Sequence, residues 1–189
     1  MVPLGFNTLV ELVEKVQDWE THPLVADDSE MWSSFVWAVL LGGSKSEAEV
    51  NYVLGILENS GLTERSSLNP HWKDEAVSVL SEAKSEITKG DVNPEGKKGA
   101  IKKIEVELSQ IDTTLKSADE IFNRTPRIRA DYLRSIANNT DTEDRFIADF
   151  ASSDIAIGTR VHPITTHTRK IPGIAYTKTI LWMHRCGIG

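Results

Sequence analysis

The residue types that could perform chemistry gather near the C-terminus, in the stretch Arg169, Lys170, Ile171, Pro172, Gly173, Ile174, Ala175, Tyr176, Thr177 and Lys178. Proline fixes the entry to a tight turn, and glycine permits positive φ with no side chain in the way. The amides at the start of the following helix could then bind a DNA phosphate without reading base sequence. We therefore predict a DNA-binding hairpin here, with an incidental Pro–Gly turn as the competing interpretation.

The charge distribution favours the DNA interpretation of this stretch. The 189 residues carry a formal net charge of −7, yet no Asp or Glu follows Asp154. The basic residues after that position are Arg160, Arg169, Lys170, Lys178 and Arg185. A surface that faces phosphate needs local positive potential, and the rest of the protein can stay acidic. Chance asymmetry in a short tail is the alternative.

Apolar residues recur at helical spacing along most of the chain. The predicted helices cover residues 9–16, 29–41, 44–59, 72–88, 101–115, 129–137, 146–150 and 177–186. Ser44 and Glu47 have the spacing of a capping box for the third helix. Residues 90–99, with three glycines and a proline, are predicted to be a loop. Residues 155–161 could form a strand or a connector, and no second strand of matching quality exists.

These elements predict an all-α fold in one domain over residues 1–189, with the helix-hairpin-helix element at 165–186. The longest apolar run, residues 35–41, is too short to span a membrane. No secretory signal is evident at the N-terminus. The single cysteine, Cys186, cannot form an intrachain disulfide and fits a reducing, intracellular location, which we take as cytoplasmic.

Two regions together resemble the helix-hairpin-helix superfamily of DNA glycosylases. The first is the hairpin, where Ala175 stands in place of the usual second glycine. The second is residues 35–44, with sequence FVWAVLLGGS, which look like the family's early core helix and the polar turn after it. The resemblance implies that this turn lies near the pocket for a damaged base. It also implies double-stranded DNA as the partner and base excision repair as the process.

The resemblance assigns a catalytic role to Lys178. In the bifunctional branch of the family, a lysine just after the hairpin attacks the sugar C1′, releases the base and permits β-elimination of the 3′ phosphate. Lys178 stands one residue later than the commonest spacing. Such an amine must be partly neutral, which requires burial or cationic neighbours, and we expect His184 and Arg185 to supply them. An exposed lysine that contacts only phosphate or water is the alternative.

The family also places an essential Asp beyond the helix that follows the hairpin, and no acidic residue follows Asp154 here. The resemblance therefore leaves three possibilities: the C-terminal part with this Asp is missing, another arrangement replaces it, or the protein does not catalyse. We expect no cofactor and no metal site, since none of the five histidines forms a ligand pair with recognised spacing. The identity of the damaged base and the oligomeric state stay open.

Other side chains have structural explanations. The tryptophans are expected in the core, although one could stack on an extruded base. A basic cluster, which either is a solvated helix face or follows the DNA backbone, consists of Arg124, Arg127, Arg129 and Arg134. The sequence thus favours a DNA glycosylase/AP lyase-like enzyme. The alternatives are a non-catalytic helix-hairpin-helix DNA-binding module and a helical protein–protein interaction domain.

Overall fold

Helices make up the regular secondary structure of the part of the chain that the structure describes. The computed structural model describes residues 23–42, 45–124, 130–131, 134, 171–174 and 176–187, and no strand occurs among them. The α-helices with defined ends among these residues are α2 (Asp28–Leu40), α3 (Glu47–Asn59), α4 (Trp72–Glu86), α5 (Pro94–Glu105), α6 (Leu108–Arg124) and α9 (Tyr176–Arg185). A short 3₁₀ helix, η1, covers Arg65–Ser67. The predicted helical fold is confirmed for these residues. The helices predicted over 9–16 and 146–150, most of 129–137, and the possible strand over 155–161, lie outside them.

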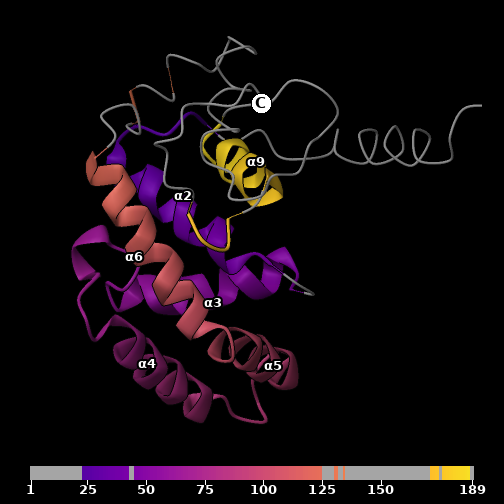
Figure 1. Cartoon of the computed structure of the whole chain (residues 1–189). Helices are drawn as coiled ribbons and strands as arrows, with labels where there is room; N and C mark the ends of the chain where they lie inside the picture. The colour runs from indigo at the N-terminus through magenta and orange to yellow at the C-terminus, as the bar shows by residue number, and fades with distance from the viewer. Residues whose placement is uncertain are drawn as a thin grey trace, which may run out of the picture.

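Helix α2 forms the centre of the core, as its nearly continuous apolar surface predicts. The Asp27 side chain caps its N-terminus by accepting hydrogen bonds from two backbone amides, those of Ser29 and Glu30, each at 2.9 Å. Eight of its thirteen residues are buried. Helices α3, α6 and α9 surround it in Figure 1, and each packs against it. Helix α2 is therefore enclosed by helices from both halves of the chain.

Aromatic rings hold α6 and α9 against α2. Phe35 of α2, Phe122 of α6 and Trp182 of α9 meet edge to face, with ring centroids 5.4–5.8 Å apart. The indole N–H of Trp182 also donates to the Met31 carbonyl at 3.1 Å. The predicted core position of the tryptophans is confirmed for the described ones, which are Trp32, Trp37, Trp72 and Trp182. This cluster fixes the position of α9, the helix that carries Lys178.

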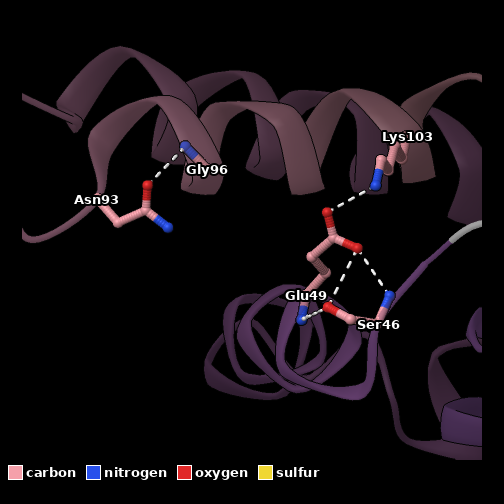
Figure 2. A network of polar contacts seen from close by, with 5 residues as sticks. All are labelled: Ser46, Glu49, Asn93, Gly96 and Lys103. Atoms are coloured by element: carbon pink, nitrogen blue, oxygen red, sulfur yellow. Dashed lines mark hydrogen bonds and ion pairs between the residues drawn. The ribbon is translucent and has the colours of Figure 1, made fainter.

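Helix α3 begins two residues later than the sequence pattern indicates. The capping box is formed by Ser46 and Glu49, so the predicted box of Ser44 and Glu47 is wrong. Both pairs have the required spacing of three residues, and spacing alone does not distinguish them. Figure 2 shows that Glu49 also accepts from the Lys103 ammonium of α5 at 2.7 Å. This second contact, between α3 and α5, favours the later start.

The segment predicted as a loop over residues 90–99 is helical from Pro94 onward. Asn93 adopts the left-handed backbone conformation, with φ of 52°, and its side chain accepts from the Gly96 amide at 3.2 Å (Figure 2). Proline is favourable at the first position of a helix because its missing N–H has no partner there anyway. The prediction of a loop relied on the glycines and overlooked Pro94 as a helix start. In the folded protein, burial of Ile101 and Ile104 stabilises the helix.

The single helix predicted over residues 101–115 consists of two helices that meet at a corner. Helix α5 ends at Glu105 and α6 begins at Leu108. The Glu107 amide donates back to the Ile104 carbonyl at 2.9 Å, and the Glu107 carbonyl accepts from the Ile111 amide at 2.9 Å. Apolar residues continue at helical spacing across the corner because both helices bury them in the same core. Periodicity therefore concealed the break.

The boundaries of α4 and α9 and the end of α3 agree with the sequence to within about two residues, whereas α6 continues to Arg124, nine residues beyond the predicted end at 115. Helix α4 starts at Trp72 as predicted and ends at Glu86. Helix α3 closes at Asn59, just before Gly61, whose φ is 71°. Helix α9 ends before Gly187, whose φ is 80°. Within the described residues, no helix combines the length and the apolar character that a membrane span requires.

Candidate functional site

The Pro–Gly stretch forms a tight turn directly before α9. The Ile174 amide donates to the Ile171 carbonyl at 3.2 Å, and Gly173 between them has φ of 80°. Proline at the second position and glycine with positive φ at the third are the signature of a type II turn. Ile171 and Ile174 are buried, whereas Pro172 and Gly173 are exposed. The turn is thus anchored by its ends and presents its tip to solvent.

Helix α6 holds this turn in place. The Thr114 hydroxyl donates to the Pro172 carbonyl at 2.8 Å. A Cβ atom on Gly173 would lie 2.9 Å from that hydroxyl oxygen, so the close approach of the turn requires a glycine. The part of the predicted helix-hairpin-helix element that precedes the turn covers residues 165–170, which include Arg169 and Lys170. These residues, Ala175 and the side chains of Tyr176 and Thr177 lie outside the part of the chain described.

Lys178 extends from the first turns of α9 toward the end of α2. Its ammonium donates to the Val39 carbonyl at 2.8 Å, in the last turn of α2, where carbonyls point beyond the helix end. The side chain is half-buried. Burial lowers the pKa of the Lys178 amine, and the Lys45 ammonium lowers it further, whereas the Glu107 carboxylate acts in the opposite direction. A larger fraction of this amine is neutral at a given pH than in an ordinary lysine.

The amine of Lys178 lies in a pocket of about 240 Å³. Its wall comes from four elements: the end of α2, the turn, α9 and one face of α6 with the corner before it. The lining residues are Val39, Gly42, Glu107, Gln110, Ile111, Thr114, Gly173 and Lys178. A pocket of this size, with a few polar groups around an amine, suits one ring of a small molecule or of a nucleotide rather than a larger ligand.

Two features around the amine were absent from the sequence prediction. Lys45 and Glu107 form an ion pair at 2.5 Å, and the side chain of Lys45 is only 2% exposed, against 41% for Glu107. Nothing in the sequence signals this pair, because 62 positions separate its members. Thr114 and Gln110 were also missed, since they are two polar residues among many on an amphipathic helix.

The cation that acts on Lys178 is Lys45, and the prediction that His184 and Arg185 supply it is wrong. Six or seven residues along a helix correspond to roughly 10 Å of axial rise, which places those side chains near the far end of α9. The Arg185 guanidinium instead lies over the Trp37 ring, 5.1 Å from its centroid.

Gly42, which follows α2, approaches the Lys178 amine, and residues 43 and 44 lie outside the described part of the chain. Gly42 lines the pocket, and a Cβ atom on it would lie 3.2 Å from the Lys178 Nζ. The structure brings Gly42, the Pro–Gly turn and Lys178 together from positions more than 130 residues apart in the sequence.

The second basic cluster has one member whose side chain is described. The Arg134 guanidinium donates to the Val25 carbonyl at 2.9 Å and to the Ala26 carbonyl at 2.5 Å, and thereby supports the segment before α2. Arg127 and Arg129, and the side chain of Arg124, lie outside the described residues. Among the described residues, no group of three or more His, Cys, Asp or Glu side chains could hold a metal ion.

Comparison with protein-family models, with curated proteins and with solved structures returns no match. The functional assignment of the pocket therefore depends on its own geometry and chemistry.

Proposed function

We propose that this protein is a DNA glycosylase/AP lyase of the helix-hairpin-helix type, with Lys178 as its nucleophile. In this proposal the exposed tip of the Pro–Gly turn contacts a duplex DNA phosphate, and a damaged nucleotide enters the pocket. The Lys178 amine attacks C1′, releases the base and forms a Schiff base that permits cleavage of the strand. The protein then acts inside the cell, on DNA.

The observation that carries the proposal is the placement of the Lys178 amine inside a polar pocket next to the turn. Lysines that form Schiff bases are activated by desolvation and by a neighbouring cation, because both favour the neutral amine. Both influences act on Lys178, through its burial and through Lys45. A lysine that only contacted phosphate would need neither a pocket nor a lowered pKa.

The geometry of the turn supports DNA as the partner. Pro172 and Gly173 are exposed while their neighbours on both sides are buried, so the backbone of the tip is accessible to a phosphate. Helix α9 begins two residues after Ile174, and the N-terminus of a helix attracts anions through its amides and its dipole. The absence of acidic residues after Asp154 removes one source of repulsion.

Borohydride trapping tests the proposal, because it converts a Schiff base between protein and DNA into a stable adduct. We expect the wild-type protein to form an adduct with a duplex that contains one abasic site, and Lys178→Gln to form none. Duplex affinity should be largely retained, because the substitution removes only one positive charge. Lys116→Gln is the matched control, since Lys116 lies on α6 and pairs with Asp112 at 2.8 Å outside the pocket.

A second function, a non-catalytic DNA-binding module, is favoured by the hydrogen bond from Lys178 to Val39. In that case the ammonium caps the end of α2 and offsets the negative end of its dipole. The wild-type protein would then bind abasic duplex with strong salt dependence and form no adduct. If Lys178 only contacts phosphate, its replacement should lower the salt slope by about one. Absence of salt-dependent binding would leave the third function, a protein–protein interaction domain.

A further inference from the structure

Glu107 is the acidic side chain that lines the pocket together with the Lys178 amine. Its backbone is held on both sides of the corner between α5 and α6, through the Ile104 carbonyl and the Ile111 amide. Its carboxylate is held by the Lys45 ammonium at 2.5 Å, and yet the side chain is 41% exposed. The carboxylate is therefore fixed in position and accessible to a molecule in the pocket.

Other acids near this corner are engaged elsewhere. Glu105, on α5, pairs with Lys84 at 2.7 Å, and Asp112, on α6, pairs with Lys116 at 2.8 Å. Neither of them lines the pocket. Within the described residues, the geometry singles out Glu107 as the carboxylate that could exchange a proton with a molecule bound at Lys178.

A lysine that cleaves DNA through a Schiff base needs a proton acceptor in the same pocket. Once the imine has formed, the carbon next to it must lose a proton before the strand can break, and a positioned carboxylate is a common acceptor in such steps. On the basis of the function proposed above, we propose that Glu107 is this acceptor, and that the substrate of the step is an abasic or base-free nucleotide in duplex DNA.

The proposed step balances without any further reactant. The Lys178 Nζ adds to the C1′ aldehyde of the opened sugar, and water leaves as the protonated imine forms. The Glu107 carboxylate takes a proton from C2′, and the electron pair of that C–H bond moves toward the imine to give an enamine. The enamine electrons then form the C2′–C3′ double bond while the C3′–O bond breaks. The 3′ phosphate leaves as the end of the released strand.

Glu107→Gln separates this step from the formation of the Schiff base. We expect the variant still to form the borohydride-trapped adduct with abasic duplex, because Lys178 is retained and loss of the Glu107 carboxylate removes the influence that raises the pKa of its amine. Strand cleavage without borohydride should fall by about 100-fold or more, the usual range for loss of a positioned acid or base. Glu105→Gln, which removes the same charge two residues away and outside the pocket, should leave adduct and cleavage unchanged.

A double variant guards against failure to fold. Glu107→Gln alone leaves the buried Lys45 ammonium without its partner, whereas Lys45→Met combined with Glu107→Gln removes both charges. A thermal melt identifies which variant is folded. The single variant should form the adduct in wild-type yield, the double variant should form it in the yield of Lys45→Met, which also lacks that ammonium, and both should cleave slowly. Cleavage by the variant at the wild-type rate would overturn the role of Glu107, and so would loss of the adduct together with cleavage. In either case an adduct formed by the wild type would leave the proposed function intact. No adduct from the wild type would overturn both.

Discussion

Replacing Gly173 by alanine tests whether the turn at the site has the geometry described above. Alanine at φ of 80° is strained, because its Cβ approaches the neighbouring carbonyl, and this strain amounts to roughly 1–2 kcal/mol. The new Cβ would also lie 2.9 Å from the Thr114 hydroxyl oxygen. Displacing that hydroxyl loses its hydrogen bond to Pro172, worth about 1 kcal/mol. We therefore expect the free energy of unfolding to fall by about 2–3 kcal/mol.

Two other glycines separate these contributions. Gly61 has φ of 71°, and a Cβ on it meets nothing within 4 Å, so Gly61→Ala should lose only the strain of about 1–2 kcal/mol. Gly55 lies inside α3, also with nothing within 4 Å of the added atom. Gly55→Ala should stabilise the protein by about 0.5–1 kcal/mol, because alanine loses less backbone freedom on folding.

Thermal unfolding followed by circular dichroism ranks the three variants. For a chain of this length, a loss of 2–3 kcal/mol lowers the melting temperature by roughly 4–12 °C. The expected order is Gly55→Ala highest, then the wild type, then Gly61→Ala, and Gly173→Ala lowest. If Gly173→Ala melts with the wild type, the positive φ at the turn is wrong. If it melts with Gly61→Ala, the contact with Thr114 contributes nothing.

Two further predictions concern groups outside the pocket. Burial raises the pKa of the Cys186 thiol to about 12, so the thiol stays protonated at neutral pH and should react with a thiol reagent only after unfolding. The labelling rate of the native protein is compared with that of a guanidinium-unfolded sample, and rapid labelling of the native protein would contradict this prediction. Asn93→Ala removes the cap of α5 and places a residue with a Cβ and no polar group at φ of 52°, so a urea titration should show a loss of about 1–2 kcal/mol. Asn93→Gly, which tolerates that φ, should lose only a few tenths, and equal losses in both variants would show that the backbone conformation is unimportant.

The sequence by itself determined those features that depend on neighbours within about four positions. The start of α2 follows from Asp27, whose carboxylate accepts from amides two and three residues on. The end of α9 follows from Gly187, which adopts a positive φ at low energetic cost. The turn at Gly173 likewise follows from proline and glycine in adjacent positions. Each of these features depends only on the local backbone geometry that the residue types permit.

The tertiary structure selected between local conformations wherever two of them were nearly equal in free energy. Ser44 and Ser46 both offer a capping box to α3, and the contact between Glu49 and Lys103, 54 positions away, favours the second. A single helix and two helices are equally compatible with the apolar pattern across Glu107. Packing of both halves around one core fixes the corner, and the corner brings Glu107 to the pocket.

The chemistry of the site was decided in the same way. The sequence drew attention to Lys178 because of its place after the turn, but burial, the Val39 carbonyl and the Lys45 ammonium determine its protonation. The bond to Val39 spans 139 positions and the ion pair of Lys45 spans 62. Local propensity carries no information about such contacts, because they arise only when the hydrophobic core fixes several helices against one another.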